Sequence, residues 1–78
     1  MNELSLKEMN TKRVVYFYKP NGEGNPGEIV YDVAQKNTTI ALKASGDEIG
    51  RYAYKAQKRV QEYIEQKMFP KRDIQAWY

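Results

Sequence analysis

The sequence predicts an α+β fold in which a three-stranded antiparallel sheet packs on one long α-helix as a two-layer sandwich. Three short segments rich in β-branched and aromatic residues, at 13–19, 28–34 and 38–44, are separated by turn-forming residues. One amphipathic segment follows them, from residue 47 to about residue 69. The C-terminal residues 71–78 are apolar enough to dock on the sheet or to form a fourth strand at its edge. We expect residues 1–78 to form a single domain, because chains of this size bury barely enough surface for one core.

The predicted strands follow from local composition and periodicity. Residues 1–12 are mostly polar, and we expect them to be frayed or to form a short helix. Residues 20–27 contain two prolines and three glycines, which predicts a long hairpin connection rather than a helix or a central strand. After this loop, Ile29, Tyr31 and Val33 alternate with their neighbours at the two-residue period of a strand.

The predicted helix has start and stop signals. Ser45 and Glu48 have the spacing of a capping box, in which the two side chains bond free backbone N–H groups at a helix start. Apolar residues then recur every three or four positions on one face: Ile49, Tyr52, Ala53, Ala56, Val60, Tyr63, Ile64 and Met68. Pro70 ends the helix near Phe69, because the residue before a proline avoids helical geometry.

The composition excludes several kinds of chemistry. The chain has no cysteine and no histidine, so it lacks disulfides, thiolate nucleophiles, imidazole bases and the usual zinc ligands. Gly22 and Gly24 precede a predicted strand rather than a helix, which does not fit a phosphate-binding loop. Glu28 and Asp32 lie roughly 13 Å apart along one strand, too far for a glycosidase pair. We therefore expect a protein that is not an enzyme, with no catalytic residue, no metal site and no cofactor.

The sequence also indicates a cellular setting. Its longest apolar run, residues 14–18, is far shorter than the ~20 residues needed to cross a membrane. The chain does not begin with the basic and apolar pattern of a secretory signal. These observations, together with the absence of cysteine, predict a cytoplasmic protein that does not bind membranes.

The predicted strands contain more apolar positions than one helix can cover. Two sets alternate along residues 13–19, namely Val14, Tyr16 and Tyr18 on one face and Val15 and Phe17 on the other. If the second set is in the core, Tyr16 and Tyr18 lie on the outer face near Val30. Three interpretations of this surplus are open: a cover made by the C-terminal tail, a surface for a protein partner or a second copy, and a platform for stacked bases.

Our first functional hypothesis is a small non-catalytic module that binds a protein through this aromatic sheet face and can also self-associate. Its predicted contact residues are Tyr16, Tyr18, Val30, Tyr54 and Trp77. The alternative is nucleic-acid binding through the sheet face and the basic residues of the helix. Its predicted contact residues are Arg13, Lys19, Lys43, Arg51, Lys55, Lys58 and Arg59. The formal net charge is only +3 and no predicted element is a continuous basic stripe, which favours the protein partner.

Overall fold

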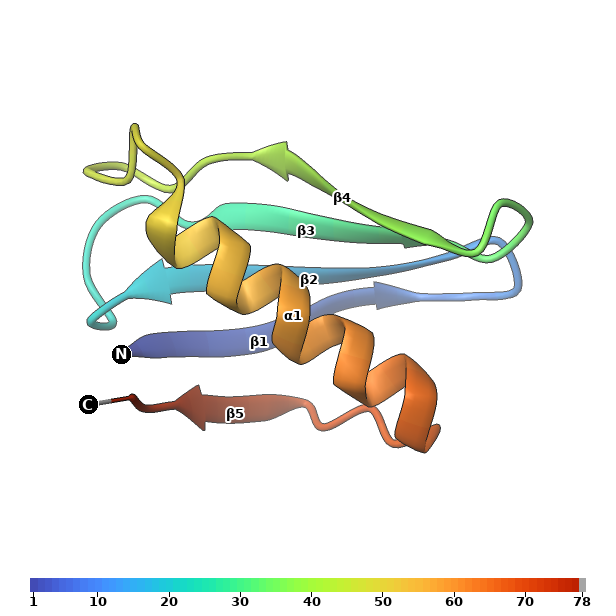
Figure 1. The fold of residues 1–78 in the computed structure, drawn as a ribbon. Helices are drawn as coiled ribbons and strands as arrows, with labels where there is room; N and C mark the ends of the chain where they lie inside the picture. The colour runs from blue at the N-terminus through green and yellow to red at the C-terminus, as the bar shows by residue number, and fades with distance from the viewer. Residues whose placement is uncertain (78) are drawn as a thin grey trace.

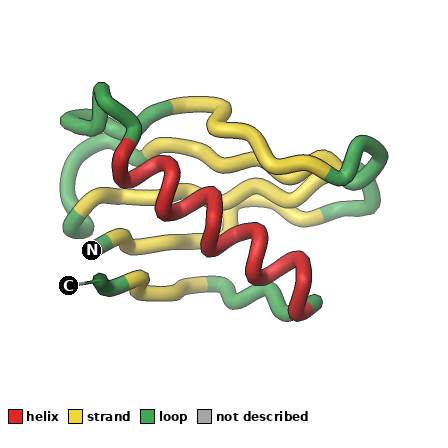
Figure 2. Tube along the Cα trace, viewed as in Figure 1, coloured by secondary structure: helices red, strands yellow, loops and turns green. Residues whose placement is uncertain are grey.

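A computed structural model describes residues 1–77 and has two layers, a five-stranded antiparallel sheet and one helix. The elements are β1 (Asn2–Met9), β2 (Arg13–Pro20), β3 (Gly27–Asp32), β4 (Asn37–Leu42), α1 (Arg51–Gln66) and β5 (Arg72–Gln75). The strand order is β4-β3-β2-β1-β5, and α1 crosses one face of this sheet (Figures 1 and 2). The predicted α+β class is confirmed, whereas the prediction of three strands is wrong.

The N-terminal segment is the first correction. Residues 2–9 form β1, which pairs with β2 on one side and with β5 on the other, rather than a frayed end or a short helix. Leu4 is fully buried in the core. Most residues of β1 are polar, so its composition did not predict a strand. Its backbone pairs with β2 and with β5, which lie far apart along the chain.

The C-terminal segment forms an edge of the sheet. Residues 72–75 pair with β1 in antiparallel register, with Asn2 opposite Gln75 and Ser5 opposite Arg72. This arrangement is the edge-strand alternative that the sequence left open. The segment extends the sheet sideways and does not cover its outer face (Figure 1). Tyr78, the last residue of the predicted tail, lies outside the described residues.

The sequence left open which side of β2 faces the helix, and the structure has the opposite side to the one that the predicted contacts Tyr16 and Tyr18 require. Tyr16 and Tyr18 are 0% exposed and belong to the core beneath α1. The Tyr16 hydroxyl donates to the Pro70 carbonyl at 2.6 Å. The Tyr18 hydroxyl donates to Asp47 Oδ2 at 2.8 Å and accepts from the Ala44 N–H at 2.9 Å. Because both hydroxyls have hydrogen-bond partners, their burial costs little free energy. With Tyr16 and Tyr18 turned inward, Val15 and Phe17 lie on the outer face of the sheet.

The core lies between α1 and the inner face of the sheet. It consists of Leu4, Val14, Tyr16, Tyr18, Ile29, Ala44, Ala53, Ala56, Val60 and Tyr63. Tyr31 and Ile40 pack against it, as the alternation in their strands predicts. Val33, which follows β3, and Leu42, the last residue of β4, are 39% and 53% exposed.

The helix starts later than predicted and has a different cap. Its first residue is Arg51, and the preceding loop holds Asp47 with its carboxylate over the first turn. Asp47 accepts from the Tyr52 N–H at 3.1 Å and from the Ala53 N–H at 2.9 Å. Ser45 instead accepts from the Asn25 N–H, so the predicted capping box is wrong. Ile49 lies outside the helix and is 89% exposed.

The helix also ends earlier than predicted, at Gln66. Lys67 adopts a left-handed conformation with φ 56°, and its N–H donates to the Ile64 carbonyl. The Met68 N–H donates to the Tyr63 carbonyl. This pair of bonds is a Schellman motif, which ends the helix before Pro70 is reached. It directs the following residues back toward β1.

Across residues 1–77, no helix combines the length and the apolar character that crossing a membrane requires.

Candidate functional site

The structure separates the residues that the sequence predicted as partner contacts. Tyr16 and Tyr18 are in the core and cannot touch a partner in the folded chain. Val30 is half-buried on the outer face of the sheet, opposite Val15. Tyr54 is 57% exposed on α1, and Trp77 is half-buried beside the same helix. Tyr54 and Trp77 therefore lie on the side of the molecule that carries α1, near the predicted basic residues of that helix.

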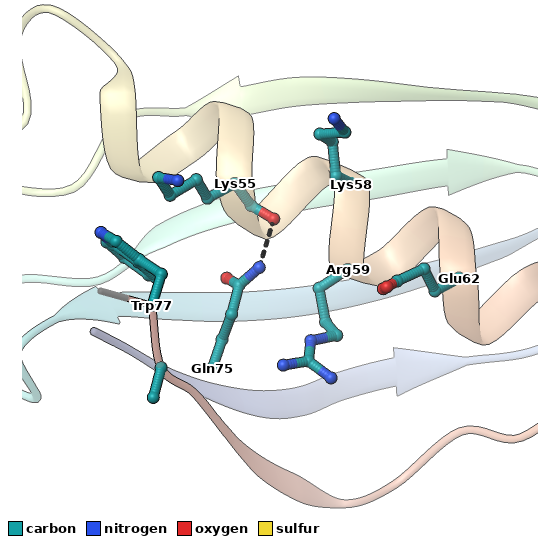
Figure 3. A pocket seen from close by; sticks show the side chains of 7 residues that line it. Lys55, Lys58, Arg59, Glu62, Gln75 and Trp77 are labelled. Atoms are coloured by element: carbon teal, nitrogen blue, oxygen red, sulfur yellow. Dashed lines mark hydrogen bonds between the residues drawn. The ribbon is translucent and has the colours of Figure 1, made fainter.

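A groove between α1 and the C-terminal segment brings Trp77 together with three of the predicted cations. Its lining residues are Lys55, Lys58, Arg59 and Glu62 from α1 and Gln75, Ala76 and Trp77 from the end of the chain, and we call it the α1–β5 groove (Figure 3). It is open to solvent and has a volume of about 280 Å³. Lys55 and Arg59 extend toward the C-terminal segment in Figure 3, whereas Lys58 extends to the opposite side of the helix.

Hydrogen bonds fasten the two walls of the groove. Gln75 Nε2 donates to the Lys55 carbonyl at 2.8 Å, drawn as a dashed line in Figure 3. Asn2 Nδ2 donates to Gln75 Oε1 at 3.1 Å and to the Tyr52 carbonyl at 3.0 Å. Asn2 is fully buried, so strands β1 and β5 are held to the first turns of α1. The position of Trp77 follows from this anchor two residues earlier.

Two lysines of α1 lie over aromatic rings. Lys55 Nζ is 4.7 Å from the centroid of the Trp77 ring, and Lys58 Nζ is 5.3 Å from the centroid of the Tyr54 ring. The Trp77 ring also packs against Tyr52, with centroids 5.4 Å apart and ring planes at 56°. Such cation–π contacts contribute about 0.5–1 kcal/mol at exposed sites. The ammonium groups are thus oriented but easily displaced.

The charge of the groove is positive. Three cations face one lining carboxylate, Glu62. Arg59 Nη1 also lies 3.7 Å from Asp73 Oδ2, in a long ion pair whose side chains are 31% and 27% exposed. Within residues 1–77, no carboxylate lies within 4.0 Å of the ammonium group of Lys55 or Lys58. The groove can therefore bind an anion with Lys55 and Arg59, and Lys58 adds a positive charge on the adjacent face of α1.

The other predicted basic residues do not join the groove. Arg13 bonds Glu8 at 2.8 Å at the far end of β2, an ion pair that lowers the pKa of Glu8 and raises that of Arg13. Lys43 donates to the Glu48 carbonyl at 3.0 Å. Lys19 lies near the end of β2, and Arg51 is exposed on the first turn of α1. Of these four residues, Arg51 alone shares the helix with the groove lysines.

A second hollow lies at the C-terminal end of α1 and has a structural role. Its volume is about 470 Å³, and Tyr63, Met68, Phe69, Pro70 and Asp73 are among its lining residues. The Tyr63 hydroxyl donates to Asp73, and burial together with this carboxylate raises the pKa of Tyr63. This bond fastens β5 to α1 from the other end.

Among residues 1–77, no three Asp, Glu, His or Cys side chains are grouped to hold a metal ion.

The outer face of the sheet is less aromatic than predicted. Phe17 is its aromatic residue in β2, and Lys7 Nζ lies 5.2 Å from the centroid of that ring. Lys7 also bonds Glu28 at 3.1 Å, an ion pair that spans β2 from β1 to β3. Ile74 and Leu42, on the two edge strands, are 54% and 53% exposed. The centre of this face holds half-buried Phe17 beneath the ion pair, with buried Val15 and half-buried Val30 beside it, and its exposed aliphatic residues lie on the edge strands.

No known family model, curated protein or solved structure matches this chain. The functional inference therefore starts from the residues of the groove. Sequence reasoning identified four of its lining residues, namely Lys55, Lys58, Arg59 and Trp77, but assigned them to two different hypotheses. It missed Gln75 and Ala76, because their place beside α1 depends on the pairing of β5 with β1.

Proposed function

We propose that this chain is a non-catalytic module that binds nucleic acid through the α1–β5 groove. The observation that carries the proposal is the joint placement of Lys55, Arg59 and Trp77 in one open groove. Phosphates are bound mainly by lysine and arginine, and exposed bases stack on aromatic rings. The groove offers both kinds of group within the reach of one ligand.

The helix extends the positive surface beyond the groove. Arg51, Lys55 and Arg59 recur at four-residue steps, so they lie on one side of α1 and span roughly 12 Å of its length. Glu62 and Glu65 follow in the last turns of α1. The basic surface is therefore short, and we expect three or four phosphate contacts rather than a long binding track.

The burial of the tyrosines reverses the order of the two sequence-based hypotheses. A protein partner on the sheet face was favoured because of Tyr16 and Tyr18, and both are 0% exposed. The nucleic-acid alternative depended partly on α1, whose Lys55, Lys58 and Arg59 line the groove. Its members Arg13 and Lys43 are engaged in local contacts, so we assign the contact to Arg51 and the three groove cations.

The test is the binding of a labelled 12-nucleotide single strand, followed by fluorescence anisotropy at 50 mM and 200 mM salt. Three or four phosphate contacts predict about 20- to 50-fold weaker binding at the higher salt. The double variant Lys55→Ala, Lys58→Ala should weaken binding by at least about tenfold at 50 mM salt, since two phosphate contacts are lost.

The matched control removes two positive charges from the opposite end of the sheet, in the turns after β1 and β3. It is Lys12→Ala with Lys36→Asn, since Lys36 has φ 56° and asparagine tolerates that conformation. This variant should keep most of the affinity. Absence of binding at 50 mM salt, or an equal loss in both double variants, would contradict the proposal.

A protein partner on the outer sheet face is the second candidate. It is favoured by Ile74 and Leu42, which are more than half exposed on the edge strands. The Lys7–Glu28 ion pair over Phe17 makes the centre of this face polar, which places it behind the groove. A chain that binds no oligonucleotide at 50 mM salt leaves this face as the stronger candidate.

A further inference from the structure

We infer that the α1–β5 groove and the adjacent face of α1 together select single-stranded nucleic acid, with one base stacked on Trp77 in the groove and a second on Tyr54 beside it. The inference rests on the proposed function and adds the class of ligand. It follows from the arrangement of two aromatic rings, each with a lysine ammonium group above it, on the same side of the molecule as α1.

The first ring–lysine pair is in the groove itself. Trp77 is held beside α1 by the bonds of Gln75 and by its contact with Tyr52. The groove next to it has a volume of about 280 Å³ and is open to solvent. Lys55 Nζ lies 4.7 Å from the ring centroid, so a phosphate attached to a base on this ring would be close to a cation.

The second pair continues from the first. Tyr54 is 57% exposed and precedes Lys55 in the chain. Its partner Lys58 is one helical turn further on, with Nζ 5.3 Å from the ring centroid, and Lys58 also lines the groove. Tyr54 and Lys55 are consecutive residues of α1, so the two pairs lie on adjacent faces of the helix, about 100° apart. A flexible strand that leaves the groove over the helix can reach both with consecutive nucleotides.

A stacked base must replace the ammonium group over the ring. This exchange is favourable because stacking of a base on an aromatic side chain is the stronger contact, and an exposed cation–π contact is weak. The displaced ammonium keeps its charge and gains a phosphate partner. Each ring–lysine pair is thus matched to one nucleotide, the ring to its base and the lysine to its phosphate.

A duplex lacks this match. Its bases are stacked on one another and cannot be splayed onto protein rings, so it can use only the cations. The helix lies flat on the sheet with β5 beside it (Figure 1), and Glu62 lines the groove next to the cations. These features limit how closely a rigid double helix with two phosphate strands can approach α1.

The experiment uses the intrinsic fluorescence of the full chain, which contains a single tryptophan, Trp77. The probes are an eight-nucleotide oligothymidylate, a 12-base-pair duplex and inorganic polyphosphate, each titrated at 50 mM salt. We expect the oligothymidylate to quench Trp77 and to bind at least about fivefold more tightly than the duplex. Polyphosphate, which has no bases, should leave the tryptophan emission nearly unchanged.

Variants separate stacking from charge. Tyr54→Ala and Trp77→Ala should each weaken oligothymidylate binding by about fivefold or more, with duplex binding much less affected. Trp77→Phe, which retains a ring, should keep most of the affinity and shows whether Trp77→Ala acts only through folding. Met68→Ala, at a residue that is 66% exposed beyond the helix, is the matched control for loss of an exposed apolar side chain.

Each outcome decides the inference. Equal binding of oligothymidylate and duplex without quenching would overturn the stacking arrangement while leaving nucleic-acid binding intact. Full affinity of Tyr54→Ala and Trp77→Ala would overturn it as well. If neither nucleic acid binds at 50 mM salt, both this inference and the proposed function fail.

Discussion

Asp47 shows how a single side chain defines the start of a helix. It is 4% exposed, and its carboxylate accepts from two backbone N–H groups of α1 and from the Tyr18 hydroxyl. The sequence indicated a helix start in this region, but it favoured Ser45 and Glu48 as the capping pair. The loop between β4 and α1 determines which side chain reaches the first turn, and Gly46 and Gly50 have positive φ in that loop.

Asp47 is therefore expected to be the most sensitive residue of this loop. Asp47→Ala leaves three buried or half-buried donors without a partner, and we expect a loss of about 3 kcal/mol in the free energy of unfolding. Urea denaturation measures this loss. Glu48→Ala, which changes the exposed neighbour, should stay within about 0.5 kcal/mol of the parent chain. Similar losses in the two variants would show that Asp47 is not the cap.

Gly27, the first residue of β3, lies where the segment before α1 packs closely against the sheet. It is buried under the Tyr18 side chain, and a Cβ atom there would lie 2.6 Å from the Ala44 backbone nitrogen and 2.5 Å from Tyr18 Cζ. The glycine-rich character of residues 20–27 predicted a turn correctly. The close packing of Gly27 against the segment before α1 is a separate requirement, which composition alone does not indicate.

At the scale of elements, this packing gives a second prediction. Gly27→Ala should lower the free energy of unfolding by about 3 kcal/mol, because the added methyl group has backbone on one side and a buried ring on the other. Gly46→Ala is the comparison, since its Cβ would meet nothing within 4 Å and its φ of 80° costs only about 1–2 kcal/mol. Urea denaturation of both variants measures the difference. Equal losses would contradict the steric explanation.

The two edge elements show where local patterns fail. Strand β2 and the amphipathic face of α1 are evident from periodicity, because each carries its own apolar repeat. Strand β5 has only four residues, of which Ile74 is the sole aliphatic one and points away from the core. Its position depends on Gln75, Asp73 and the register with β1. Three of the seven lining residues of the groove, Gln75, Ala76 and Trp77, come from this end of the chain, so the groove could not be predicted as a unit.

The whole molecule depends on neutral buried tyrosines. Burial raises the pKa of Tyr16 and of Tyr18 to about 12, and it also raises that of Tyr63. In the unfolded chain these phenols ionise near pH 10. Between those values the unfolded state binds fewer protons than the folded state, so the free energy of unfolding falls as pH rises.

We therefore expect full tyrosine-linked stability below about pH 10 and progressive loss toward pH 12 and above. Urea midpoints measured from pH 9 to pH 12, together with the tyrosinate absorbance, check this dependence. Tyr16→Phe should have a shallower decline, because one titrating phenol has been removed. A midpoint that is constant up to pH 12, or an unchanged decline in Tyr16→Phe, would contradict the linkage.

Local composition and periodicity were enough to predict the α+β class, the hairpin connection at residues 20–27 and the sets of residues that share a face of β2 and α1. The two-residue alternation of a strand shows which side chains lie on the same face. It does not show which of the two faces is buried, because both faces have the same alternation. The inward orientation of Tyr16 and Tyr18 depends on long-range contacts, because their hydroxyls bond Pro70, Asp47 and Ala44 from distant parts of the chain. The same long-range pairing adds β1 and β5 to the sheet and brings Trp77 to the lysines of α1.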